Sequence, residues 1–117
     1  MEHKVKVLFV ENHPEFAATV SATFLQGHAL TVVPSIKSAR RALSQGSFDV
    51  ALVDYDLDDG KGVELLRWIK GQGLRVRVIA ISARNEGNTE LMAAGADLVC
   101  KKTEFGKIGS LLGEDAP

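Results

Sequence analysis

The chain has 117 residues, a formal net charge of −1 and a single cysteine, which exclude an intrachain disulfide and a strongly basic nucleic-acid footprint. Hydrophobic residues make up 45% and charged residues 25% of the chain, a balance that excludes a disordered polypeptide. No apolar run reaches the ~20 residues that a membrane helix requires. We therefore expect one cytoplasmic domain over residues 1–117, with no membrane contact and no direct binding of nucleic acid.

Five apolar runs recur along the chain, with helical patterns between them. The runs cover residues 5–10, 29–33, 50–53, 76–81 and 98–100. They are nearly continuous rather than alternating, which is typical of strands buried on both faces of a parallel sheet. The spacing predicts helices over 14–26, 62–70 and 87–94, one between a Ser35 N-cap and Gly46, and a last short helix carrying Phe105, Ile108 and Leu112. This order predicts an α/β fold, a doubly wound parallel sheet with helices on both faces.

Polar side chains follow the predicted strands at their carboxyl ends, where ligands bind in an open parallel sheet. They are Glu11 and Asn12 after the first strand, Asp54, Asp56 and Asp58 after the third, Ser82 and Arg84 after the fourth, and Lys102 after the fifth. Carboxylates that converge repel one another unless a cation neutralises them, and hard oxygen ligands suit Mg²⁺. The sequence therefore predicts a magnesium site at this edge of the sheet.

The chain resembles the receiver domain of two-component response regulators over essentially its whole length. The resembling segments are residues 7–14, residues 52–54 with Gly62 eight positions after Asp54, residues 79–83, and residues 95–97 leading to Lys102. The resemblance implies a five-stranded sheet in 2-1-3-4-5 order. It also implies an aspartate that accepts a phosphoryl group from a histidine kinase or phosphotransfer protein, with Mg²⁺ bound.

The resemblance assigns a role to each polar residue at the strand ends. Asp54 matches the phosphoacceptor, Ser82 the hydroxyl that bonds the phosphoryl group, and Lys102 the amine that pairs with it, so we expect Lys102 rather than Lys101 to point inward. The metal ligands implied are Glu11, Asn12, Asp54 and the backbone carbonyl of Asp56. Residues matching Asp56 and Arg84 tune phosphoryl lifetime in the family, and we expect an ion pair between these two side chains across the site mouth.

The chain departs from the family pattern at four positions. Asn12 stands where the family has a second acid, so we expect weak Mg²⁺ binding, and Asp58 stands where it has a proline and places another acid nearby. Thr103 replaces a second proline, and Val99 replaces a switch aromatic. An alternative for Asn12 is an N-cap paired with Glu15 in a capping box.

The resemblance also indicates how the domain would signal. The partner surface implied is the face of the fourth helix, fifth strand and fifth helix, which here carries Leu91, Met92, Val99, Phe105 and Lys107. A homodimer through this face stays open. We interpret His13 as a surface imidazole and Cys100 as a small core residue.

Two other functions fit parts of the sequence. One is a degenerate receiver that binds or dimerises without phosphorylation, which Asn12, Val99 and Thr103 favour. The other, more remote, is a Toprim-type Mg²⁺-dependent nucleic-acid enzyme, whose glutamate and Asp-x-Asp pattern would be Glu11 with Asp54 and Asp56. That second alternative leaves Ser82 and Lys102 unexplained.

Overall fold

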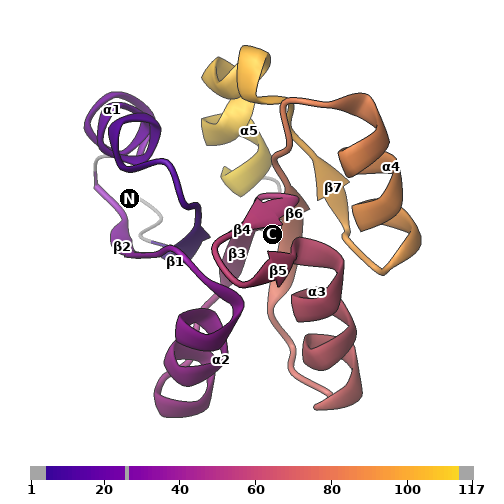
Figure 1. Cartoon of the computed structure of the whole chain (residues 1–117). Helices are drawn as coiled ribbons and strands as arrows, with labels where there is room; N and C mark the ends of the chain where they lie inside the picture. The colour runs from indigo at the N-terminus through magenta and orange to yellow at the C-terminus, as the bar shows by residue number, and fades with distance from the viewer. Residues whose placement is uncertain (1–4, 26, 114–117) are drawn as a thin grey trace.

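The five predicted strands form one parallel sheet (Figure 1). The computed structural model describes residues 5–25 and 27–113, so the ends of the predicted 1–117 domain and residue 26 of the first predicted helix lie outside the described residues. The strands are β1 (Lys6–Val10), β2 (Ala29–Val33), β3 (Val50–Val53), β6 (Arg77–Ala80) and β7 (Leu98–Val99), in the order β2-β1-β3-β6-β7. This order is the predicted 2-1-3-4-5, and the α/β fold class is confirmed.

A small hairpin of two short strands, which was not predicted, lies between β3 and β6 in the chain. It consists of β4 (Asp56–Leu57) and β5 (Gly60–Lys61), which pair antiparallel. The hairpin follows β3 directly and lies over the carboxyl edge of the sheet (Figure 1). Strands of only two residues carry no periodic signal in a sequence, which is why this hairpin was not predicted.

Helices cover both faces of the sheet, as predicted. They are α1 (Pro14–Phe24), α2 (Ile36–Gln45), α3 (Gly62–Gly71), α4 (Asn85–Ala93), a 3-10 segment η1 (Lys102–Lys107) and α5 (Ile108–Gly113). In Figure 1, α1 and α5 lie on one side of the sheet and α2 and α3 on the other. None of the helices within residues 5–25 and 27–113 is long and apolar enough to cross a membrane.

Successive residues of the central strands alternate between two hydrophobic clusters, because side chains along a strand point to opposite faces. On β1, Leu8 and Val10 pack with the buried residues of α2 and α3, whereas Val7 and Phe9 pack with those of α1 and α5. All four side chains are fully buried. This two-sided burial is why the apolar runs in the sequence are continuous rather than alternating.

Helix α2 shows how local sequence signals position the elements. The Ser35 side chain accepts a hydrogen bond from the Ser38 amide, and Ser38 reciprocates in a capping box. Ile36, Ala39 and Leu43 face the core, and Gly46 ends the helix, all as predicted. Asp59 at the hairpin tip adds bonds from the amides of Ile36 and Lys37. These bonds, against the opposing effect of burial, lower the pKa of Asp59.

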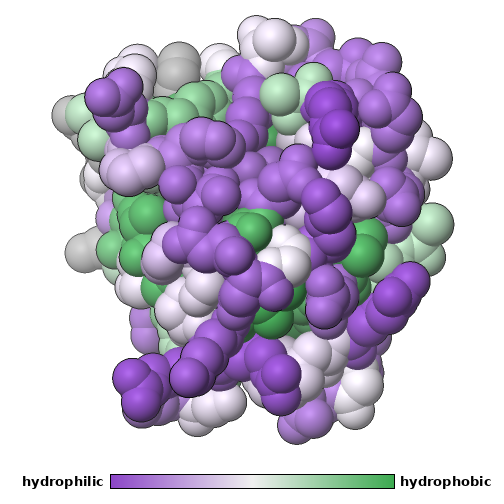
Figure 2. Space-filling view, viewed as in Figure 1, coloured by the Kyte–Doolittle hydropathy of each residue, from purple (hydrophilic) through white to green (hydrophobic). Residues whose placement is uncertain are grey.

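The last helical stretch and the single cysteine also agree with prediction. Phe105, Ile108 and Leu112 are buried on one face, although the chain is a 3-10 helix up to Lys107 before it becomes α-helical. Cys100 is 3% exposed and unpaired. Burial raises the pKa of its thiol, and the nearby Glu104 adds to this. Figure 2 shows polar side chains over most of one face of the molecule, with only small separate apolar areas.

Candidate functional site

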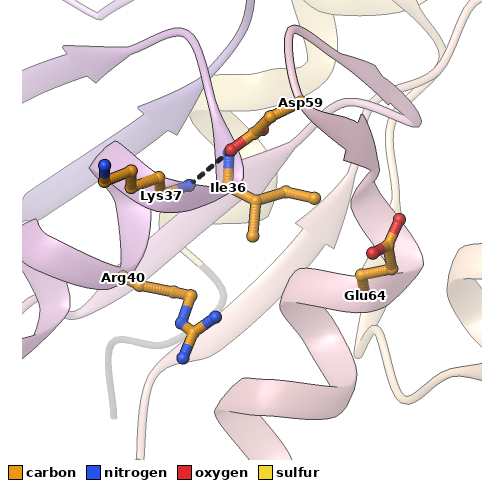
Figure 3. A pocket seen from close by; sticks show the side chains of 5 residues that line it. All are labelled: Ile36, Lys37, Arg40, Asp59 and Glu64. Atoms are coloured by element: carbon orange, nitrogen blue, oxygen red, sulfur yellow. Dashed lines mark hydrogen bonds between the residues drawn. The ribbon is translucent and has the colours of Figure 1, made fainter.

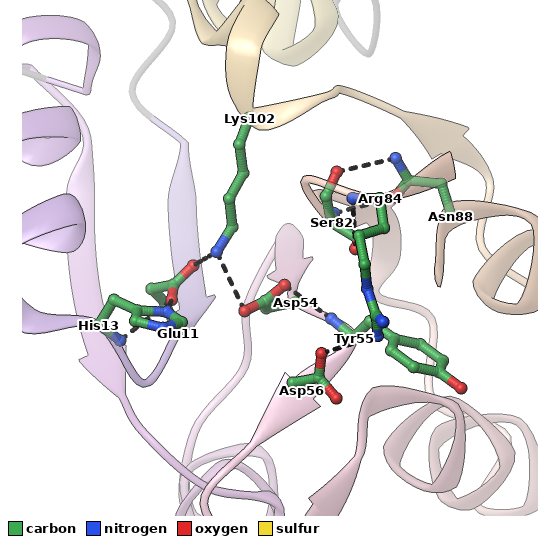
Figure 4. Close-up of polar contacts among 9 residues, drawn as sticks. All are labelled: Glu11, His13, Asp54, Tyr55, Asp56, Ser82, Arg84, Asn88 and Lys102. Atoms are coloured by element: carbon green, nitrogen blue, oxygen red, sulfur yellow. Dashed lines mark hydrogen bonds and ion pairs between the residues drawn. The ribbon is translucent and has the colours of Figure 1, made fainter. Parts of the chain in front are cut away.

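The ammonium group of Lys102 links two acids from different strands at the carboxyl edge of the sheet (Figure 4). Its Nζ lies 2.8 Å from Glu11 Oε1, after β1, and 3.1 Å from Asp54 Oδ2, after β3. The three side chains are 13%, 0% and 6% exposed, respectively. Lys101 is exposed, so Lys102 is the inward member of the pair, as expected. The predicted convergence of these side chains is confirmed.

Asp54 is held in a buried, negatively charged setting. Burial raises the pKa of its carboxyl, the neighbouring Glu11 raises it further, and Lys102 opposes both effects. The Tyr55 amide donates to Asp54 Oδ1 at 2.8 Å, while Oδ2 faces Lys102. These two contacts fix the orientation of the Asp54 carboxylate.

The glycine eight residues after Asp54 is required by close packing. A Cβ on Gly62 would lie 2.2 Å from the backbone oxygen of Asp54 and 3.1 Å from a methyl group of Val53. The Gly62 amide donates to the Tyr55 carbonyl at 2.6 Å. The first turn of α3 thus rests directly on the backbone that presents the Asp54 carboxylate.

Ser82 is positioned by a residue that the sequence did not single out. Asn88, in the first turns of α4, accepts from the Ser82 amide at 2.9 Å and donates to the Ser82 carbonyl at 3.0 Å. Ser82 Oγ accepts from the Arg84 amide at 3.1 Å, and a Cβ on Gly87 would lie 2.6 Å from this oxygen. Ser82 and Asn88 are 3% and 5% exposed. Buried Asn88 therefore clamps the loop that carries the hydroxyl.

Two cations, Arg84 and Lys61, pair with Asp56 at the mouth of the site. Arg84 Nη2 lies 3.1 Å from Asp56 Oδ2, which confirms the expected ion pair, and Lys61 forms a second bond to Asp56. The Lys61 bond is the main reason that the pKa of Asp56 is lowered. Both cations also lie over the Tyr55 ring, at 5.1 Å for Lys61 and 5.6 Å for Arg84. Because these side chains are about half exposed, the pairs contribute little to stability.

The N-cap interpretation of Asn12 is wrong. Helix α1 begins at Pro14, so His13 is the N-cap, and it makes no side-chain cap hydrogen bond. The physical reason is that proline favours the first helical position, which moves the cap to the residue just before it. Asn12 Oδ1 is instead buried without a hydrogen-bond partner among the described residues.

His13 is a surface imidazole, as expected, and it also contacts an acid of the site. Its side chain is 63% exposed, but Nδ1 lies 2.7 Å from Glu11 Oε2, and its backbone amide donates to the same oxygen at 3.0 Å. One ligand atom each from Glu11, His13 and Asp54 lie within 4.8 Å of one another. The described part of the chain thus holds one candidate metal cluster here, composed of two acids and an imidazole.

Three other expectations require correction. Asp58 lies exposed at the hairpin tip, where its amide donates to the Pro34 carbonyl, so the structure does not bring its carboxylate into the site. Leu91 is fully buried and Phe105 is 3% exposed, so these two are core residues rather than parts of a partner surface. Their apolar positions face inward because the flanking helices pack on the sheet.

A separate open pocket lies between α2 and α3 (Figure 3). It is lined by Ile36, Lys37, Arg40, Asp59 and Glu64, none of which is a predicted site residue. Its two cations and two acids balance one another, and Asp59 is already bound to the α2 amides. None of the residues that line this pocket belongs to the site at the carboxyl edge of the sheet.

The sheet order and the position of the site at the carboxyl edge define a flavodoxin-like α/β domain. Residues 7–110 match the family profile described as the response regulator receiver domain. The chain therefore belongs to the receiver-domain family of two-component response regulators. Because the chain is a member of this family, the Toprim-type alternative is wrong.

Curated relatives agree with this assignment. The two-component response regulator PhoP of Pseudomonas aeruginosa is 31% identical over 90 residues, which cover 74% of this chain and 40% of PhoP. The response regulator protein PilR of the same species is 29% identical over 111 residues, which cover 92% of this chain and 25% of PilR. The chain thus spans well under two thirds of the length of these relatives.

Solved structures show the same fold. The receiver domain of the Francisella response regulator 1452 superimposes with a TM-score of 0.81 at 22% identity, covering 97% of this chain and 100% of that one. A CheY-like receiver domain from Methanospirillum hungatei gives a TM-score of 0.83 at 18% identity, covering 97% and 94%. At these identities the similarity concerns the fold alone.

Proposed function

We propose that Asp54 is the phosphoacceptor of this receiver domain and that Ser82 and Lys102 act with it. The observation that carries the proposal is the Lys102 ammonium, which lies within 3.1 Å of both Asp54 and the buried Glu11. A buried carboxylate next to a fixed cation is suited to phosphoryl transfer, because positioning and charge neutralisation supply most of that catalysis.

The chemical step is a substitution at phosphorus. An Asp54 carboxylate oxygen forms a bond to phosphorus while the nitrogen–phosphorus bond of a phosphohistidine donor breaks. The donor imidazole leaves with the electron pair and takes up a proton. Lys102 Nζ then pairs with the negative phosphoryl oxygens, and the Ser82 hydroxyl donates to one of them.

The residues at the edge of the sheet also fit a divalent cation. Asn12 Oδ1 is buried without a partner among the described residues, and a metal would satisfy it. The ligands would be Asn12, Asp54, the Asp56 backbone carbonyl and Glu11. When bound, Mg²⁺ neutralises charge on the carboxylates and the phosphoryl oxygens. Because the Asn12 amide brings no charge, we expect weak Mg²⁺ binding.

The proposed partners are a histidine kinase or phosphotransfer protein upstream and an effector downstream. We place the effector contact on the exposed part of the face formed by α4, β7 and η1. There, Met92 is 42% exposed, Val99 is partly exposed and Lys107 is exposed. Phosphorylation adds about −1.5 to −2 charges at Asp54, and movement of the Ser82–Arg84 loop toward it would reshape α4. We expect this to happen in the cytoplasm.

The test is phosphorylation by a small-molecule phosphodonor, recorded as intact mass with and without Mg²⁺. We expect one Mg²⁺-dependent phosphoryl adduct on the unchanged protein and none on Asp54→Asn. The matched control is Asp49→Asn, which changes an aspartate at the opposite edge of the sheet that accepts from the Lys6 amide. An adduct that persists in Asp54→Asn would refute the assignment of the acceptor.

A second candidate function follows from Asn12 and Val99, which lack the charge and the aromatic ring expected there. If no adduct forms at any Mg²⁺ concentration, the chain is a binding or dimerisation module instead. The Asn12→Asp variant distinguishes a working receiver from a binding or dimerisation module. We expect it to tighten Mg²⁺ by completing the acidic pair and, in a working receiver, to speed phosphorylation.

A further inference from the structure

We propose that the outer sides of α2 and α3 form a docking surface for an acidic helical segment of a partner protein. The juxtaposition that carries the proposal is a set of exposed cations on α2 beside a stacked arginine and tryptophan that join this helix to α3. This surface, the α2–α3 face, consists of Lys37, Arg40, Arg41, Arg67 and Trp68. None of these residues belongs to the site at the carboxyl edge of the sheet, so the inference does not depend on phosphoryl transfer.

Positive charge is concentrated on this face although the chain as a whole has a formal net charge of −1. Helix α2 carries three cations and no acid, whereas α4 carries two acids and no cation. The four cations of the α2–α3 face are all exposed, namely Lys37, Arg40, Arg41 and Arg67. A local excess of positive charge attracts a partner of opposite charge and orients it during docking.

These four cations form no ion pair within residues 5–25 and 27–113. The cations at the carboxyl-edge site and on η1 are, by contrast, paired with acids: Lys61, Arg84, Lys102 and Lys107. The charges of the α2–α3 face are therefore the ones that remain available to a partner.

The two acids that lie beside this face are bound to backbone amides instead. Asp59 accepts hydrogen bonds from the amides of Ile36 and Lys37 at the start of α2. Glu64 Oε2 accepts from the Lys61 amide at 2.9 Å, at the start of α3. Both carboxylates thus serve the first turns of the helices, and neither pairs with a cation side chain of the face.

The centre of the face is a stacked pair that holds an arginine in place. Figure 3 shows Arg40 extending from α2 toward α3, and its guanidinium lies 5.1 Å from the centre of the Trp68 ring. Trp68 itself is partly exposed. A guanidinium stacked on a ring keeps its N–H groups free to bind a carboxylate with two parallel hydrogen bonds. Tryptophan and arginine are also the residues that dominate binding at protein–protein interfaces, which favours a protein partner.

A helix with spaced carboxylates suits this face better than a nucleic acid does. Asp59 and Glu64 line the open pocket between α2 and α3, and the continuous row of phosphates in a nucleic acid would be repelled by both. A partner helix can instead place single carboxylates one turn apart. Lys37 and Arg41 have the same spacing on α2, so the two helices can pair charge with charge. The space between two packed helices also accepts a third helix lengthwise.

The experiment uses Trp68 as its reporter, because it is the only tryptophan in the chain. The full chain is titrated, without a phosphodonor, with a synthetic alanine-rich helical peptide that carries glutamates one turn apart. The same peptide with glutamine in place of glutamate is the uncharged control. We expect the glutamate peptide to change the Trp68 emission in a saturable manner and the glutamine peptide to leave it unchanged. Raising NaCl from about 0.05 M to about 0.5 M should weaken binding at least fivefold, because salt screens exposed charges.

A variant locates the binding on the face. The double variant Lys37→Gln/Arg41→Gln should weaken the glutamate peptide at least fivefold while α2 stays folded, since glutamine is as good a helix former as lysine or arginine. The matched control is Lys101→Gln, an exposed cation after β7, which should leave the affinity within twofold. The proposal is overturned if the glutamate peptide leaves Trp68 emission unchanged, or if the double variant binds it as tightly as the unchanged protein. Tighter binding of a single-stranded oligothymidylate than of the glutamate peptide would also overturn it, in favour of a nucleic-acid partner.

Discussion

Replacing Gly62 by alanine should destabilise the packing of α3 against the backbone of Asp54. The new Cβ would lie 2.2 Å from the Asp54 backbone oxygen and 3.1 Å from a Val53 methyl group. Ordinary van der Waals contacts begin at 3.4 Å, so the backbone oxygen is more than 1 Å too close. That oxygen belongs to the chain directly after β3 and cannot rotate away as a side chain would.

The expected cost follows from this overlap. Overpacking a well-packed interior costs about 1–3 kcal/mol, and a clash with backbone belongs at the upper end. Gly62 is the first residue of α3, so the gain in helix propensity from alanine is small there. We therefore expect Gly62→Ala to lower the free energy of unfolding by about 2–3 kcal/mol. For a domain of this size the melting temperature should fall by roughly 10 °C.

The assay is equilibrium denaturation by urea, compared with Gly71→Ala. Gly71 is the last residue of the same helix, and a Cβ there meets nothing within 4 Å. Alanine is favoured over glycine in helices by up to about 1 kcal/mol, so this control should raise stability slightly. If Gly62→Ala is as stable as Gly71→Ala, the close packing of α3 on Asp54 is not as described.

Three further predictions concern the buried polar groups. Asp54→Asn should raise the free energy of unfolding at pH 7. Because burial raises the pKa of Asp54 in the folded protein, this carboxyl stabilises the fold below its ordinary pKa of 3.8, and that stabilisation is lost as pH rises through the folded pKa. Urea denaturation at pH 7 and pH 4 should therefore show that the variant's gain in unfolding free energy over the unchanged protein is smaller at pH 4. Lys102→Met should destabilise the fold by about 3 kcal/mol at pH 7, because it leaves two buried acids unpaired, whereas Lys101→Met should change stability by under about 0.5 kcal/mol. Cys100 should react with a thiol reagent far more slowly in the native protein than in denaturant, because its thiol is buried and its pKa is raised.

Each of these has an outcome that would contradict it. A gain in Asp54→Asn that widens toward pH 4 would mean that this carboxyl titrates below its ordinary value. Equal losses from Lys102→Met and Lys101→Met would mean that the ion pairs at the site add nothing to stability. Rapid labelling of Cys100 in the native state would mean that the segment after β7 opens readily.

The sheet could be predicted from sequence because its signals are local and repeated. Continuous apolar runs such as Val50–Val53 arise from burial on both faces, and the start of α2 is written in Ser35 and Ser38. The convergence of Glu11 and Asp54 followed from topology, since parallel strands end at one edge, whereas the choice of Lys102 over Lys101 came from the family resemblance. The arrangement of these side chains was therefore predictable from the sequence.

The partners within the site could not be predicted in the same way. Asn88 clamps Ser82 and Tyr55 stacks under two cations only because α4 and the β4–β5 hairpin pack over the edge of the sheet. The N-cap position fell on His13 rather than Asn12 through a shift of one residue in the start of α1, which sequence signals rarely resolve. Leu91 was assigned to the surface by resemblance, and only packing shows that it is buried.

The Lys102 bridge has a consequence for how the chain matures. Glu11 and Asp54 come together as soon as β1 and β3 pair, yet the ammonium that pairs with both follows β7, the last strand of the sheet to be synthesised. A growing chain that stops before this lysine would hold two mutually repelling carboxylates with no resident counter-ion. Only a chain that has added β7 and the following turn therefore carries the cation that pairs with both acids.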